Sequence, residues 1–111
     1  MAEPCFPCQI IYGMENPRNK ELASSRHFLI VIDNENTSQL FIIPLKPVAD
    51  IDALIDSNPE IAKEVKVLTK KMAGYVANNF PDSTSCDIKR CSTFCGRGKL
   101  GMHQYITIII L

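Results

Sequence analysis

The stretch from Gly98 to Leu111, GKLGMHQYITIIIL, decides the fold of this chain. From Met102 onward it is rich in β-branched residues and contains neither proline nor glycine, which predicts a strand. Because a strand points successive side chains to opposite faces, one face would carry mostly isoleucines. The other face would begin with His103, Tyr105 and Thr107. Three polar side chains in a row suggest a functional site, although a solvated edge strand would explain the same pattern.

Length predicts a single domain over residues 1–111, and the order of its segments, given below, predicts the α+β class. Hydrophobic residues make up 46% of the chain, which is enough for one core. Twelve basic and twelve acidic side chains cancel, so bulk electrostatic binding to nucleic acid is not expected. No apolar run approaches the roughly 20 residues of a membrane span, and MAEPCFPC does not resemble a signal peptide. We therefore expect no membrane association and a cytoplasmic location, where the five cysteines would be thiols or metal ligands.

The other segments alternate between strand-like and helical patterns. Strands are predicted over His27–Asp33, Gln39–Pro44 and Cys86–Phe94, with a short extended piece near Lys20–Ala23 in the polar Met14–Ser25 loop. Helices are predicted over Ala49–Asp56 and from Pro59, capped by Asn58, to just before Pro81. Five charged side chains of the long helix lie off its apolar stripe and should face solvent: Lys63, Glu64, Lys66, Lys70 and Lys71. The order predicts an antiparallel sheet of about five strands, with one long and one short helix packed on it.

A basic, glycine-rich loop, Cys95-Gly96-Arg97-Gly98-Lys99, leads into the last strand. Glycines let backbone N–H groups approach a phosphate closely, and the arginine and lysine add positive charge. Together with His103 this loop would suit an anion or a phosphate ester. A turn that uses glycine for its geometry alone explains the same residues.

Several segments resemble the histidine triad (HIT) family of nucleotide-binding proteins. The heptad from His103 to Ile109, HQYITII, fits the register of the family's strand of three alternating histidines. Cys5–Gly13, Phe28–Asp33 and Ile42–Asp50 resemble the family's opening CxxC segment, its first core strand and its Pro-Lys stretch. Cys86–Phe94 matches hardly at all. The resemblance implies a HIT-like fold and a homodimer formed through the long helix.

The resemblance places the catalytic triad positions at His103, Tyr105 and Thr107. In the family the middle histidine attacks the α-phosphate. Here Tyr105 stands in that position, and a phenol with a pKa of about 10 is protonated at neutral pH and would attack poorly. A shifted register would instead place His103 in the nucleophile position. The nucleotide contacts that the resemblance implies are Asp33, Ser92, Gly98, Lys99 and His103.

The expected function is therefore divergent HIT-type binding of a purine nucleotide such as AMP or GMP, with weak or no hydrolysis. One alternative is an active nucleotide hydrolase or transferase that uses His103 or Tyr105, so the sequence leaves open whether the protein is an enzyme. The other is a non-catalytic zinc or protein-interaction module on the same fold.

Cys5 and Cys8 have the spacing of a zinc knuckle. In zinc-bearing relatives these cysteines are joined by a histidine after the Pro-Lys pair and by the first triad histidine. Here Pro47 replaces the histidine that follows the Pro-Lys pair. Cys5, Cys8 and His103 therefore remain as an incomplete set of candidate zinc ligands. Cys91 or Cys95 could supply the fourth ligand, but the sequence does not place either one there. Two unligated thiols are the alternative.

Overall fold

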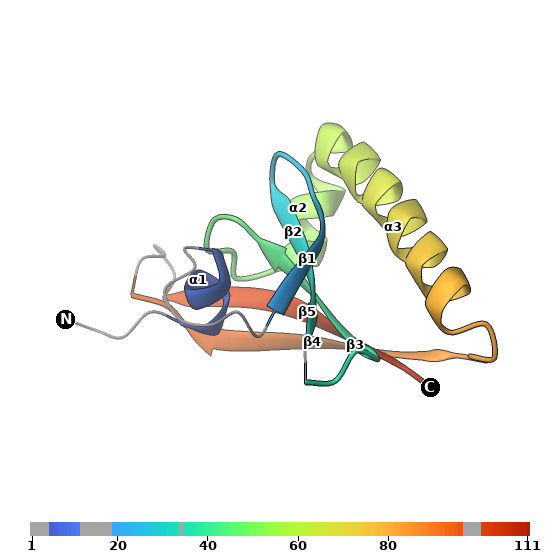
Figure 1. Cartoon of the computed structure of the whole chain (residues 1–111). Coiled ribbons are helices and arrows are strands. Elements are labelled where there is room, and N and C mark those ends of the chain that lie inside the picture. The colour runs from blue at the N-terminus through green and yellow to red at the C-terminus, as the bar shows by residue number, and fades with distance from the viewer. Residues whose placement is uncertain (1–4, 12–18, 34, 97–100) are drawn as a thin grey trace.

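The computed structural model of the chain describes residues 5–11, 19–33, 35–96 and 101–111. These residues form one five-stranded sheet in the order β1-β2-β3-β5-β4, antiparallel at every pairing (Figure 1). The elements are α1 (Phe6–Ile11), β1 (Asn19–Ser24), β2 (Phe28–Asp33), β3 (Gln39–Pro44), α2 (Ile51–Asp56), α3 (Pro59–Asn79), β4 (Cys86–Phe94) and β5 (Met102–Ile110). The predicted α+β class, the five strands and the long and short helices are confirmed.

Helices lie on both faces of the sheet. On one face, α2 and α3 bury the main core, in which Ile30, Leu40 and Ile108 are almost fully inaccessible. On the other face, α1 packs through Phe6 and its neighbours onto Val31, Phe41 and Ile43. The sequence did not predict α1, because a helix of six residues is too short for apolar periodicity to reveal it. A proline near its start is compatible with the helix, since the first N–H groups have no partner within a helix.

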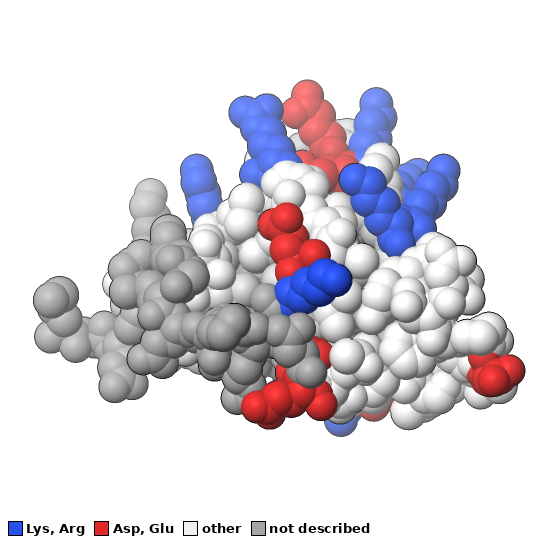
Figure 2. All heavy atoms as spheres, viewed as in Figure 1, with Lys and Arg blue, Asp and Glu red and all other residues white. Residues whose placement is uncertain are grey.

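The long helix α3 begins and ends at the predicted residues. Asn58 accepts hydrogen bonds from the backbone N–H groups of Glu60 and Ile61, and Pro59 occupies the first helical position. Basic side chains project from the upper side of the molecule, where α3 lies (Figure 2). The four lysines of α3 are exposed, as predicted: Lys63, Lys66, Lys70 and Lys71. Within the described residues, no helix is both long enough and apolar enough to cross a membrane.

A hydrogen-bonded cluster ties α3 to the turn between β1 and β2. The carboxylate of Glu64 accepts hydrogen bonds from Ser25 Oγ at 2.5 Å, from the His27 backbone N–H at 2.9 Å and from His27 Nδ1 at 2.8 Å. Burial pushes the pKa of Glu64 upward, but the hydrogen bonds from Ser25 and His27 prevail and hold it below its usual value. The prediction that Glu64 faces solvent is therefore wrong: its side chain is only 15% exposed, because Ser25 and His27 hold the carboxylate against the β1–β2 turn.

Replacing Glu64 with glutamine should therefore lower the free energy of unfolding at pH 7 by about 1–2 kcal/mol. The folded pKa lies below the unfolded one, so this stabilisation is present above the unfolded pKa and is lost as the pH falls through the folded pKa. Urea unfolding should show this difference between the two proteins at pH 7, and the difference should shrink as the pH falls below the unfolded pKa toward the folded pKa of Glu64. Glu60→Gln, an exposed position in the same helix, is the matched control. An equal loss in both variants would contradict the assignment.

Candidate functional site

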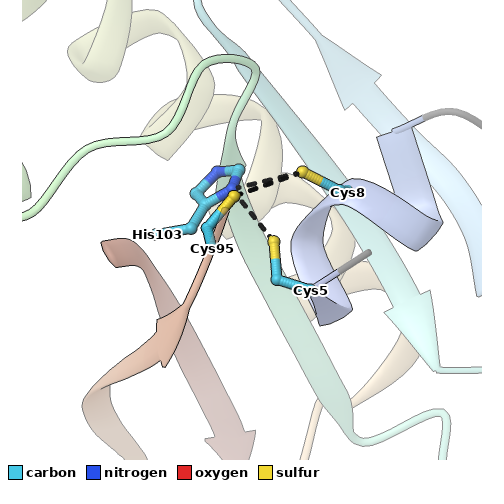
Figure 3. Close-up of side chains that lie close together, drawn as sticks. All are labelled: Cys5, Cys8, Cys95 and His103. Carbon is cyan, nitrogen blue, oxygen red and sulfur yellow. Dashed lines mark hydrogen bonds between the residues drawn. The ribbon is translucent and has the colours of Figure 1, made fainter. Parts of the chain in front are cut away.

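Three cysteine sulfurs and one imidazole nitrogen converge on a single point beside α1 (Figure 3). Cys5 Sγ lies 3.4 Å from His103 Nδ1, and Cys8 Sγ lies 3.7 Å from the same nitrogen. Cys8 Sγ and Cys95 Sγ are 3.8 Å apart, and all four atoms lie within 4.8 Å of one another. All four side chains are buried. We call this group the Cys₃His cluster.

Three of the six ligand–ligand separations in the Cys₃His cluster are close to those of a tetrahedral metal site, and no separation exceeds 4.8 Å. With metal–sulfur bonds of about 2.3 Å and a metal–nitrogen bond of about 2.0–2.1 Å, tetrahedral geometry separates two sulfurs by about 3.8 Å and a sulfur from the nitrogen by about 3.6 Å. The observed separations are 3.8 Å for the Cys8–Cys95 sulfur pair, and 3.4 and 3.7 Å for the two sulfur–nitrogen pairs. The four residues could therefore hold a metal ion.

The imidazole of His103 is oriented for this role by the backbone. Its Nε2–H donates to the carbonyl oxygen of Pro44 at 2.9 Å, which leaves the lone pair of Nδ1 directed toward the sulfurs. Metal-binding histidines commonly donate their other ring N–H in this way, which fixes the tautomer and the plane of the ring. His103 is fully inaccessible to solvent.

The chain brings the four residues together from its two ends. Cys5 precedes α1 and Cys8 lies within it, whereas Cys95 follows β4 and His103 lies near the start of β5. The Cys95 N–H donates to the carbonyl of Gly101 at 2.8 Å, and Gly101 has a positive φ of 69°, which glycine adopts without strain. A metal here would bind α1 to the β4–β5 hairpin.

Burial controls the protonation of the cluster in the absence of a cation. It raises the pKa of Cys8 to about 12 and also raises that of Cys5. Burial lowers the pKa of His103, against the opposing effect of its hydrogen bond to Pro44. Without a cation, Cys5 and Cys8 are thus protonated thiols beside a neutral imidazole. A divalent cation would reverse this balance, because it binds the thiolate form and displaces the protons.

The cluster completes the incomplete ligand set expected from the sequence. Cys5, Cys8 and His103 meet as expected, and Cys95 occupies the fourth position. Cys91 lies elsewhere, with its Sγ 3.6 Å from Thr107 Oγ1, and Cys86 is exposed at the start of β4. The path of the chain between β4 and β5 decides that Cys95, and not Cys91, is the fourth ligand. The spacing of the cysteines in the sequence does not predict that path.

Tyr105 and Thr107, which the sequence resemblance assigned to the triad, lie beside the cluster on the sheet face that α1 partly covers. The Phe6 ring of α1 has its centroid 5.1 Å from that of Tyr105 and 5.2 Å from that of Phe41. Thr107 is the cross-strand partner of Phe41, so it shares this face. Asp33 ends β2 two residues after Val31, which also packs on this face. Burial raises the pKa of Tyr105, and the neighbouring Cys91 thiol raises it further to a smaller extent. We call this surface the ligand face.

The other predicted nucleotide contacts do not all join the ligand face. Ser92 is exposed and pairs with Gln104, whose Oε1 accepts a hydrogen bond from Ile51 N–H at the start of α2. Cross-strand partners share a face, so Ser92 lies on the α2 side of the sheet, away from His103. Gly98 and Lys99 lie outside the described residues.

Comparison with solved structures supports the fold. The chain is similar to the crystal structure of a HIT family protein from Bacillus anthracis str. 'Ames Ancestor', with a TM-score of 0.64 and 23% sequence identity. The match covers 99% of this chain and 74% of that one. At this identity the similarity shows a HIT-like fold. No family model matches the sequence, and no curated protein matches it.

Proposed function

We propose that this protein binds one zinc ion in the Cys₃His cluster and that the metal has a structural role. The observation that carries the proposal is the convergence of four buried ligand atoms, three sulfurs and one imidazole nitrogen, within 4.8 Å of one another. Thiolates and imidazole favour zinc among the divalent metals, and four protein ligands leave no open position for a reacting water. The same thiol-rich centre favours a reducing compartment, so we place the protein in the cytoplasm.

Elemental analysis of the purified protein tests this proposal. We expect about one zinc per chain, retained through dialysis and removed only by a strong chelator. Iron in place of zinc, or protein that takes up no metal after reduction and reloading, would contradict it.

We further propose that the ligand face binds a purine nucleotide such as AMP or GMP. Three observations support this second function: the HIT-like fold, the position of Asp33 at the end of β2, and the half-buried aromatic rings of Phe6 and Tyr105 on the same face. A carboxylate can accept hydrogen bonds from ribose hydroxyls, and aromatic rings offer a stacking surface to a base.

Little or no hydrolysis is expected, because the histidine that remains is not available to attack a phosphate. Both nitrogens of His103 are engaged, one with Pro44 and the other with the cysteine sulfurs, and the ring has no solvent exposure. The position of the family's nucleophile carries the phenol of Tyr105, a poor nucleophile while protonated. We therefore propose that this protein binds the nucleotide without the hydrolysis that HIT proteins perform.

Calorimetry and an activity assay together test the second function. We expect AMP or GMP to bind with measurable heat, while an adenosine phosphoramidate remains uncleaved over hours. Efficient turnover that is lost in Tyr105→Phe would overturn the non-catalytic assignment and identify Tyr105 as a nucleophile. Absence of binding to any purine nucleotide, with zinc retained, would leave a zinc-stabilised interaction module as the function.

We also propose that two copies of the chain associate through β4 and the adjoining end of α3. β4 is an edge strand with an exposed Ile88, beside a largely apolar groove of about 540 Å³ whose lining includes Met72, Val76 and Phe80. An unpaired edge next to an apolar groove suits a second copy, whose own β4 would extend the sheet.

Replacing Ile88 with aspartate should convert this dimer into a monomer, because a buried unpaired charge opposes association. Light scattering after gel filtration measures the change, and we expect the dimer dissociation constant to rise at least about tenfold. Val67→Asp is the control, since Val67 is equally exposed, at 55% against 56%, but does not line the groove. A wild-type protein that is monomeric at high concentration would contradict the proposal.

A further inference from the structure

We propose that Lys89, on strand β4, binds the phosphate of the ligand and supplies the positive charge that the two replaced triad histidines cannot. This inference rests on the proposed nucleotide-binding function and names the group that would distinguish a nucleotide from a nucleoside. It is carried by strand register, by the distribution of charge over the sheet and by the exposure of Lys89.

The register places Lys89 directly beside the triad positions. Its cross-strand partner is Thr107 on β5, whose partner on β3 is Phe41, and Phe41 in turn pairs with Val31 on β2. Cross-strand partners point to the same face of a sheet. The four residues therefore form one row across the ligand face, with Lys89 at its β4 end.

No other strand residue brings positive charge to this face. The five strands contain three basic residues: Lys20, Lys89 and Arg90. Lys20 pairs with Ile32 and Arg90 pairs with Ile106, and both isoleucines belong to the core beneath α3. Arg90 is also held by Asp52 of α2, with nitrogen–oxygen distances of 2.6 and 3.0 Å. Among the strand residues, Lys89 alone is placed to meet an anion on the ligand face.

The dimensions of the sheet suit a nucleotide that lies across the strands. β2 and β5 are separated by one intervening strand, which corresponds to about 10 Å. A ribose held by Asp33 at the end of β2 would thus direct its 5′-phosphate toward β5. There the long, exposed side chain of Lys89 approaches from β4, beside its cross-strand partner Thr107, which is itself buried.

Lys89 is free enough to make this contact. Its side chain is 63% exposed, and its ion pair with Asp87 is long, at 3.8 Å between Nζ and Oδ2. Such exposed pairs contribute little to stability, so a phosphate dianion can compete for the ammonium group. Asp87 lies two residues earlier on the same face and opposes an incoming phosphate, so its removal should strengthen binding.

Calorimetry with AMP and adenosine, on the zinc-loaded full chain, tests the inference. Lys89→Glu should weaken AMP binding about tenfold and leave adenosine binding unchanged, because only the phosphate meets the altered charge. Asp87→Asn should strengthen AMP binding severalfold. The matched control is Lys66→Glu, which makes the same change in net charge on the solvent side of α3.

The outcomes separate this inference from the function on which it rests. If AMP and adenosine bind and Lys89→Glu changes both equally, or neither, the inference is wrong and nucleotide binding stands. The inference also fails if Lys66→Glu weakens AMP binding as much as Lys89→Glu, since net charge would then explain the effect. If the wild-type protein binds neither ligand, the nucleotide-binding function itself is wrong.

Discussion

Replacing Cys95 with serine should abolish stoichiometric zinc binding and lower the midpoint of thermal unfolding by about 12 °C. The three remaining ligands cannot close a four-coordinate site, and binding that is specific to the folded state is linked to stability. A metal present at a hundred or more times its dissociation constant contributes about 3 kcal/mol, which corresponds to the stated shift for a domain of this size. Elemental analysis and calorimetric melting measure both effects on the same sample.

Two other cysteines serve as matched controls for this prediction. Cys86→Ser changes an exposed thiol at the start of β4, and Cys91→Ser changes the thiol beside Thr107. Both variants should retain about one zinc per chain and melt within about 3 °C of the wild-type protein. If Cys91→Ser lost the metal while Cys95→Ser kept it, the assignment of the fourth ligand would be wrong.

Removal of the zinc should also weaken AMP binding, by about tenfold or more, at a temperature where the metal-free protein remains folded. Two metal ligands, Cys5 and Cys8, lie at the start of the segment that carries Phe6, and the Phe6 ring is part of the ligand face. A helix of six residues has little stability of its own, so we expect the proposed metal to be its main anchor. Calorimetry before chelation, after chelation and after reloading with zinc measures the coupling.

Phe6→Ala separates the contribution of the ring from that of the metal. This variant should keep its zinc, because both cysteines remain, yet bind AMP severalfold more weakly. Linkage requires that AMP raise the affinity for zinc by the same factor by which zinc raises the affinity for AMP. Equal AMP affinity with and without metal would show that α1 holds its place through its apolar contacts alone.

The elements with strong periodicity could be predicted from the sequence, and those set by tertiary contacts could not. The alternation in β5 correctly predicted that His103, Tyr105 and Thr107 share a face, since side-chain direction in a strand is a local property. The fourth ligand could not be predicted, because Cys95 reaches the cluster only through the β4–β5 turn. The face on which Ser92 lies could not be predicted either. A shift of one residue in strand register moves every side chain to the opposite face, and the weak sequence resemblance along β4 cannot fix that register.

The position of β5 has a consequence for how this protein is made. β5 emerges from the ribosome after every other strand, yet it lies between β3 and β4. Until its nine residues arrive, one edge of β3, which carries Leu40, Phe41 and Ile43, is unpaired, and β4 has no partner at all. Unpaired apolar edges promote aggregation of nascent chains. The Cys₃His cluster cannot form earlier either, because His103 belongs to β5. We therefore expect the yield in cells to depend on chaperones that protect the chain during translation, more than on the stability of the finished fold.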